Sequence, residues 1–122
     1  MTVMNTDDLA ERFKTAIKSD IAILREICST DCQLWHSTDN VWMAQGPALD
    51  AFIVAQNAGQ IGKFDEITTV STGKGFLAQT SMTMDRLGKM HVAQLMTVKD
   101  GKIVSIEEYI GFEMDLSAKL AS

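Results

Sequence analysis

The apolar residues of this chain change their spacing at Phe64. Before Phe64 they recur every three or four positions, as Leu9, Phe13 and Ala16 do, which is typical of amphipathic helices. After Phe64 they alternate with polar residues, which is typical of strands that bury one face. Because short turns join antiparallel neighbours, this half of the chain predicts an antiparallel meander. The alternating segments are 64–72, 76–86, 90–99 and 102–112.

The first half predicts three helices and one short strand. The sequence NTDD at 5–8 offers N-cap residues and negative charge for the first helix, and Asp20 can cap a second. Residues 29–38, STDCQLWHST, predict a strand, and Pro47 suits the first turn of a third helix. Together the elements predict one α+β domain over residues 1–122, with three N-terminal helices packed on a curved antiparallel sheet.

Composition narrows the classes of function. The chain has 122 residues, enough for one core and too few for two ordinary domains. Its net charge of −5 argues against nucleic acid or an anionic membrane as a partner. Charges appear by Asp7, so the apolar stretch of a signal peptide is absent. No apolar run approaches the ~18 residues of a membrane span. These features predict a soluble, cytoplasmic protein.

Two polar residues, Gln94 and Glu108, interrupt the face of the meander that should meet the helices. Burial of a carboxylate without a partner is costly and raises its pKa, so Glu108 is a candidate general acid or base. The adjacent Glu107 leaves open a register shifted by one residue, and Glu108 could also pair with a Lys or Arg. Gln94 needs hydrogen-bond partners, either from a pocket or from a neighbouring side chain. Alternation places these residues on the inner face: Phe76, Ala78, Thr80, Met82, Met84, Met90, Val92, Gln94, Met96, Val98, Val104, Ile106, Glu108, Ile110 and Phe112.

His36 and the two cysteines lie in or near the predicted first strand. In strand alternation His36 shares a face with Leu34, which should point to the interior. There His36 is either a general base near neutral pH or a structural core residue. Cys28, Cys32 and His36 are each four residues apart, but the intervening STD is typical of a helix end and C-x3-C is not the usual zinc spacing. We therefore expect two buried thiols and no metal site.

The order of elements and the last hairpin, DGKIVSIEEYI, resemble the nuclear transport factor 2-like superfamily. Within it, the chain is most similar to the SnoaL-like polyketide cyclase and ketosteroid isomerase branch. The resemblance runs from about Leu9 to Ile110 and rests on loose motifs: an acid and an aromatic near the first strand, a glycine before the third helix, and dGKI…Y at the end. It implies a cone-shaped α+β barrel with a pocket, no cofactor, and a homodimer formed through sheet faces.

The resemblance also implies which residues carry chemistry. The aspartate base on the first strand of ketosteroid isomerases falls on His36 here, and their second oxyanion-hole acid falls on Gln94. The acid near the end of the last strand in SnoaL-like cyclases has Glu108 as its nearest counterpart. The isomerase tyrosine of the first helix has no counterpart, because Phe13 lies in that region and Tyr109 belongs to the other face of the last strand. Steroid isomerisation is therefore not expected.

We expect a cofactor-free pocket protein that binds an apolar small molecule. If it is an enzyme, His36 takes a proton next to a carbonyl or activates water, Gln94 orients the substrate or stabilises negative charge, and Glu108 returns the proton. The reaction would be of the isomerase, cyclase or lyase type. The alternative is a non-catalytic ligand-binding or dimerisation module, whose inner methionines simply pack the core. The residues expected to contact the ligand are Phe13, Leu34, Trp35, Phe52, Met82, Met84, Met96 and Ile110.

Overall fold

The computed structural model describes residues 4–84 and 86–117. Its helices are all short, and none of them is long and apolar enough to cross a lipid bilayer. The helical elements are α1 (Thr6–Lys18), a 3₁₀ turn (Ile21–Ile23), α2 (Leu24–Ile27) and α3 (Gln45–Asn57). The strands are β1 (Cys28–His36), β2 (Val41–Ala44), β3 (Thr68–Ser71), β4 (Gly75–Met84), β5 (Gly88–Lys99) and β6 (Lys102–Phe112).

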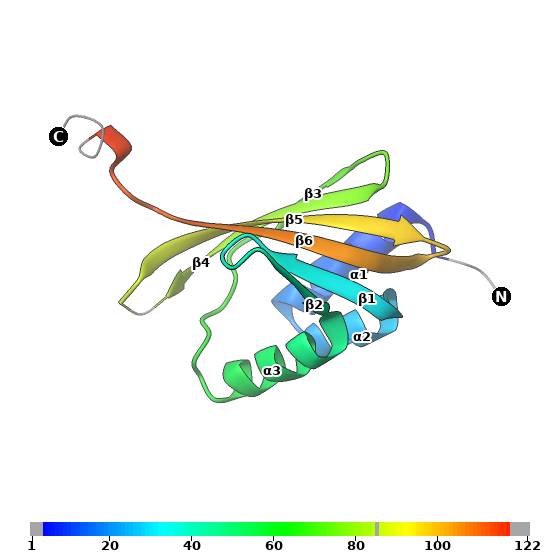
Figure 1. Ribbon diagram of the computed structural model, residues 1–122, viewed down its shortest axis with the longest axis horizontal. Helices are drawn as coiled ribbons and strands as arrows, with labels where there is room; N and C mark the ends of the chain where they lie inside the picture. The colour runs from blue at the N-terminus through cyan, green and yellow to red at the C-terminus, as the bar shows by residue number, and fades with distance from the viewer. Residues whose placement is uncertain (1–3, 85, 118–122) are drawn as a thin grey trace.

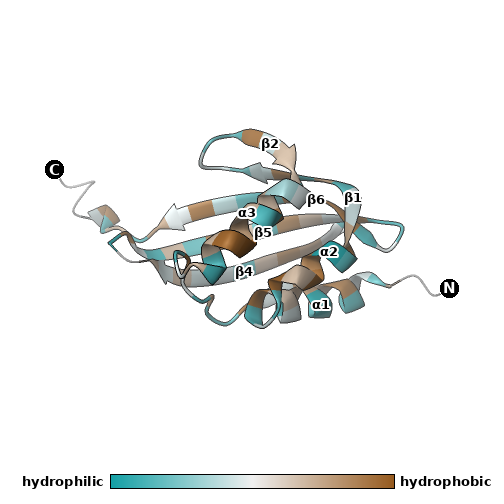
Figure 2. Cartoon of the chain, turned by 90° about the horizontal axis from the view of Figure 1, so that it is seen from below, coloured by the Kyte–Doolittle hydropathy of each residue, from teal (hydrophilic) through white to brown (hydrophobic). Residues whose placement is uncertain are grey.

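The strands of the described residues form one sheet in the order β2-β1-β6-β5-β4-β3. β3 to β6 pair antiparallel in series, which confirms the predicted meander. β1 pairs with β6 in parallel, and β2 pairs with β1 antiparallel. α1 and α3 lie across the same face of this sheet (Figures 1 and 2). The predicted α+β class is confirmed, with a sheet that is open rather than closed into a barrel and mixed rather than purely antiparallel.

One strand was missed by the sequence analysis, and another is much shorter than expected. β2 was not predicted, because four residues with mostly exposed side chains carry too little alternation to indicate a strand. The expected strand over 64–72 is shorter, since β3 covers only Thr68–Ser71 and Phe64 forms an isolated bridge with Met82. The segment between α3 and β3 is therefore mostly a connection that runs beside β4.

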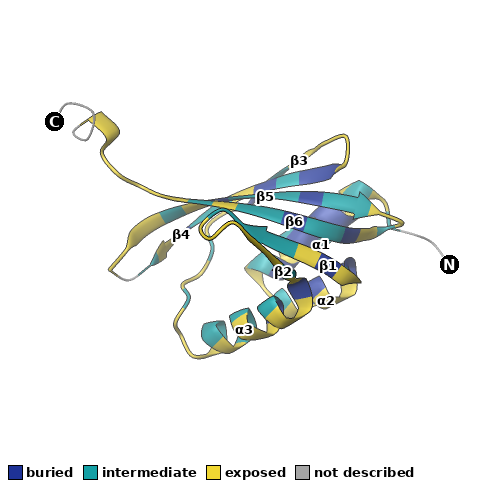
Figure 3. Cartoon of the chain, viewed as in Figure 1, coloured by how far each residue is buried: buried dark blue, intermediate teal, exposed yellow. Residues whose placement is uncertain are grey.

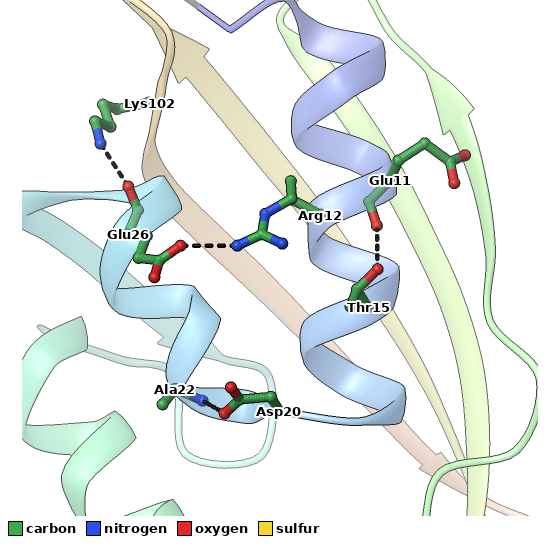
Figure 4. Close-up of polar contacts among 7 residues, drawn as sticks. All are labelled: Glu11, Arg12, Thr15, Asp20, Ala22, Glu26 and Lys102. Atoms are coloured by element: carbon green, nitrogen blue, oxygen red, sulfur yellow. Dashed lines mark hydrogen bonds and ion pairs between the residues drawn. The ribbon is translucent and has the colours of Figure 1, made fainter.

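Polar contacts at the surface hold α1, α2 and β6 in place (Figure 4). The Arg12 guanidinium pairs with the Glu26 carboxylate at 2.8 Å, and the Lys102 ammonium donates to the backbone carbonyl of Glu26. Asp20 caps the 3₁₀ turn by accepting a hydrogen bond of 3.2 Å from the backbone N–H of Ala22. These groups are exposed, so each contact contributes little to the free energy of unfolding and serves mainly to orient the elements.

The core lies where α1 and α2 cover the sheet. Phe13 of α1 and Phe76 of β4 meet edge to face with ring centroids 5.7 Å apart, and both are fully buried. Figure 3 shows the buried residues concentrated in this part of the molecule. α3 buries only Gln45 and Leu49. Hydrophobic burial thus anchors the α1–α2 side, while the α3 side of the same sheet face is packed less completely.

A β-bulge corrects the predicted faces at the start of β6. Thr97 pairs with Ser105 and Val98 pairs with Ile103, so Val104 has no partner on β5. The extra residue reverses the alternation at that point. Ile103 is fully buried in the core, although alternation assigned it to the outer face, and Val104, expected on the inner face, is half-buried. From Ile106 onward the predicted inner face is correct.

Gly75 at the start of β4 lies against the β5 backbone near this bulge. A Cβ at Gly75 would overlap the backbone carbonyl of Met96, which cannot move without disturbing the β4–β5 ladder. We expect Gly75→Ala to lower the free energy of unfolding by roughly 1–3 kcal/mol or more, the range of overpacked sites. Urea denaturation measures this. Gly73→Ala is the matched control, because nothing lies within 4 Å of a Cβ there. Equal stability of the two variants would contradict the packing argument.

Candidate ligand pocket and acid–base site

Three polar side chains form one row across neighbouring strands of the inner face. His36 of β1 pairs in register with Glu108 of β6, and Glu108 pairs in register with Gln94 of β5. Residues in register on neighbouring strands have adjacent side chains, so the three groups meet. The rows on either side are largely apolar, with Leu34 and Ile106 in one and Ile110 in the other. The row is thus a polar strip within an apolar surface.

The strip lies on the wall of a cavity of about 520 Å³ between the helices and the sheet. This volume lies within the range of ~300–1,000 Å³ that is usual for small-molecule pockets. The lining is mostly aliphatic, aromatic and methionine side chains, contributed by α1, α3 and the inner face of the sheet. Of the residues expected at the site, these line it: Phe13, Leu34, His36, Phe52, Met82, Met84, Gln94, Glu108 and Ile110.

The Glu108 carboxyl group has a partner on each side. Its Oε2 atom accepts a hydrogen bond from the Gln94 side-chain nitrogen, and its Oε1 atom lies 3.6 Å from His36 Nε2. At that separation the imidazole makes an electrostatic contact rather than a hydrogen bond. The His36 and Glu108 side chains are 22% and 19% exposed, so both are shielded yet reachable from the cavity. An acid–base pair therefore faces an apolar space.

Burial dominates the electrostatics of Glu108. Desolvation raises the pKa of its carboxyl group above the usual range, because the charged form loses the stabilisation that water gives. The hydrogen bond from Gln94 and the charge of His36 oppose this rise. The net pKa is raised, so the carboxyl can hold a proton at higher pH than an exposed glutamate can. A proton held in this way is available to a bound molecule.

The backbone around the pair is also held by hydrogen bonds. The Ser37 N–H donates to the Glu108 carbonyl at 2.8 Å, and the Ile110 N–H donates to Ser37 Oγ at 3.0 Å. The next turn begins with the Asn40 N–H donating to the His36 carbonyl at 2.8 Å. The two bonds of Ser37 attach the end of β1 to β6, so the distance between the imidazole and the carboxyl group is set by the strands rather than by a mobile loop.

Two expected ligand contacts lie outside the cavity. Trp35 lies on the outer face, because its neighbours in β1, Leu34 and His36, both face inward. Its indole N–H donates to Asn40 Oδ1 at 2.9 Å, which satisfies its polar atom at the surface. Met96 does lie on the inner face, but it packs into the closed core beneath α1 and is 2% exposed. Alternation assigns a face, but it does not separate the part of that face under a helix from the part under a cavity.

Several lining residues were missed by the sequence analysis. Met43 belongs to β2, which was not predicted, and Ile61 and Phe64 belong to the connection before β3. Phe64 stacks on Phe52 with ring centroids 6.2 Å apart. Gln45 is the most informative omission, since it is 6% exposed and is the only buried polar residue in the described part of the chain. Its only sequence signal was a polar residue at a helix start, which usually indicates an exposed position.

The cysteines do not join His36 in one cluster. Cys28 and Cys32 are buried free thiols in the core, as predicted. His36 faces the cavity instead, because the strand alternation of β1 continues to its end. Within residues 4–84 and 86–117, no group of three or more His, Cys, Asp or Glu side chains is placed to hold a metal ion.

Comparisons with known proteins identify the fold. No protein-family model and no curated protein matches the sequence. An NTF2-like protein of unknown function from Mesorhizobium loti superposes with a TM-score of 0.71 at 21% identity, over 87% of this chain and 90% of that one. A loop-truncation variant of IdmH gives 0.66 at 18% identity, over 96% and 98%. An LEH-like epoxide hydrolase from M. tuberculosis gives 0.62 at 17% identity, over 87% and 82%.

This chain has the nuclear transport factor 2-like fold. The fold implied by the resemblance is thereby confirmed. At these identities the likeness extends to the fold alone, and the chemistry of this NTF2-like chain depends on the residues of its own cavity.

Replacing Glu108 with Gln tests the desolvation of the carboxyl group. At neutral pH we expect Glu108→Gln to have a larger free energy of unfolding than the wild type, because the amide carries no charge to desolvate. In the wild type the folded-state pKa of Glu108 lies above the unfolded-state value of about 4.3. At pH values between these two pKa values, the folded protein therefore binds more protons than the unfolded protein does. The stability that the Glu108 carboxyl group contributes to the wild type is fully present below the unfolded-state pKa. It is lost as the pH rises through the folded-state pKa.

Urea unfolding of both proteins over a pH series measures the difference, which should be smallest in acid and largest above the folded-state pKa of Glu108. Glu107→Gln is the matched control, because Glu107 lies on the opposite face of β6 and pairs in register with Trp35. A difference between Glu108→Gln and the wild type that stays constant with pH would contradict the role of desolvation.

Proposed function

We propose that this NTF2-like chain binds an apolar carbonyl compound in the cavity and catalyses proton transfer on it without a cofactor. The observation that carries the proposal is the row of His36, Glu108 and Gln94 in an otherwise apolar cavity wall. An apolar core of such a fold would be more stable with aliphatic residues at these positions, because buried polar groups need partners and charged ones cost more still.

The geometry supports a division of roles. In its neutral form an imidazole such as that of His36 has one ring nitrogen that can accept a proton from the carbon beside a carbonyl. Glu108 lies 3.6 Å away with a raised pKa, so it holds a proton more readily than an exposed glutamate and can take it up and return it. Gln94 donates one side-chain N–H to the Glu108 carboxyl group, so it is chiefly a positioning residue for that group. Its second N–H is free to meet negative charge that develops on the carbonyl oxygen.

Two structural neighbours bear on the proposal. One of them is named an epoxide hydrolase and another is IdmH, at 17% and 18% identity. An enzyme on this fold supports the view that the cavity between helices and sheet can serve chemistry on a small molecule. The alternative, a ligand-binding module without turnover, uses the same cavity and differs only in whether a proton moves. A cytoplasmic location stays a prediction.

Exchange of carbon-bound protons distinguishes catalysis from binding. The probe is 4-phenylcyclohexanone in D₂O, with loss of the protons next to its carbonyl followed by NMR. We expect the protein to accelerate exchange over buffer, and His36→Ala and Glu108→Gln each to lower the acceleration by about 100-fold or more, the usual contribution of a general acid or base.

His91→Gln is the matched control, because His91 is exposed on the outer face and pairs with Glu113. If the probe changes the chemical shifts of His36 without any acceleration of exchange, catalysis is contradicted. The chain would then be a ligand-binding module without turnover. Equal exchange rates in wild type and both site variants would refute the assigned roles.

We also propose that the uncovered sheet face forms a homodimer. An aromatic cluster lies there, in which Trp35 meets Tyr109 at 5.1 Å and Trp42 at 6.5 Å between ring centroids. Trp42 and Tyr109 remain 50% and 44% exposed. Exposed aromatic side chains are enriched in protein interfaces, where a second copy of this face would bury them.

Sedimentation equilibrium tests the dimer. We expect the wild type to sediment as a dimer and Tyr109→Asp to shift it to monomer, because a charge would then be buried in the interface. Val54→Asp is the control, since Val54 is exposed on α3, on the other side of the molecule. A wild type that stays monomeric at high concentration would contradict the proposal.

A further inference from the structure

Gln45 is a buried amide whose side chain has no hydrogen-bond partner within residues 4–84 and 86–117. It is 6% exposed and lines the same cavity as His36 and Glu108. It does not cap α3, because Ala44 is the N-cap and no side-chain cap bond forms there. Among the described residues, Ser29 Oγ is the one fully buried side-chain polar atom without a partner, so the Gln45 amide, which also lacks a partner, is open to the cavity. The Gln45 amide is therefore available to a molecule in the cavity.

Gln45 is separated from the acid–base pair along the cavity. In the β1–β2 ladder His36 pairs with Val41, and three steps along the strand Gln33 pairs with Ala44, the residue before Gln45. At the usual strand rise this separation is roughly 10 Å along the wall. Leu34 and Met43, which pair with each other, line the cavity between the two polar positions. The wall is thus polar at two places with an apolar stretch between them.

We propose that Gln45 forms a second polar subsite, so that the cavity takes an elongated apolar ligand with a hydrogen-bonding oxygen at each end. One oxygen lies at the His36–Glu108 pair, and the other, a hydroxyl or carbonyl, bonds to the Gln45 amide. This inference rests on the proposed function and specifies its ligand class. The amide suits either kind of oxygen, because it carries both donors and an acceptor. Ordered water at Gln45 is the competing occupant.

A matched pair of ligands tests the subsite. The probes are 4-phenylcyclohexanone and 4-(4-hydroxyphenyl)cyclohexanone, which differ only in a hydroxyl at the end opposite the ketone. Calorimetry gives both dissociation constants. We expect the wild type to prefer the hydroxyl compound by about threefold to tenfold, the usual net gain of one hydrogen bond. Gln45→Met, which keeps the length of the side chain, should abolish this preference while still binding 4-phenylcyclohexanone.

Gln56→Met is the control variant, because Gln56 is also on α3 but does not line this cavity. It should keep the preference. An NMR measurement needs no variant to fold: the side-chain amide signal of Gln45 in the wild type should shift with the hydroxyl compound and stay in place with its parent.

The outcomes separate the two proposals. Equal affinity of the wild type for both probes overturns the subsite and leaves the acid–base proposal standing, and it favours water at Gln45. A Gln45→Met variant that loses affinity for both probes equally also overturns the subsite. That result would mean that Gln45 shapes the cavity wall and does not bond to the hydroxyl group. If neither probe binds to the wild type, the proposed function fails and the subsite fails with it.

Discussion

The parallel pairing of β1 with β6 brings the candidate site together. The two strands lie near opposite ends of the chain, and only their register puts His36 beside Glu108. The bonds through Ser37 keep that register at the end of β1, where the cavity begins. Gln94 needs no such long-range contact, since β5 and β6 are joined by the tight Asp100–Gly101 turn. The Gln94–Glu108 pair is thus determined locally by a hairpin, whereas His36 joins it only through the tertiary fold.

This difference explains how much could be predicted. Alternation on two strands of one hairpin was enough to place Gln94 and Glu108 on the same face, and the short turn sets the register that makes them neighbours. The face of His36 also followed from alternation, but its contact with Glu108 depended on a parallel pairing that no local pattern specifies. Ile103 was assigned to the wrong face because a bulge leaves no periodic signal. Met96 was on the expected face, but the sequence does not say which part of that face a helix covers.

The sequence did not predict that Gln45 lines the cavity, for a different reason. A polar residue at the start of a helix is ordinarily exposed, and here the helix begins directly after β2, a strand too short to be recognised. Only the packing of β2 against β1 carries Gln45 into the cavity. Polar residues that functional cavities use are therefore the hardest to find from a pattern, because the local rules for surface and interior give the opposite answer at such positions.

The polar groups on the cavity wall then indicate where the polar atoms of a ligand would be bound. The outer Trp35 donates its indole N–H to Asn40, so its polar atom needs no outside partner. Glu108 is only partly compensated, since burial still raises its pKa despite its two neighbours, and the Gln45 amide has no partner among the described residues. Both uncompensated groups line the same cavity. A purely apolar occupant would shield both groups from water without bonding to them, so an occupant with polar atoms at these two positions is favoured.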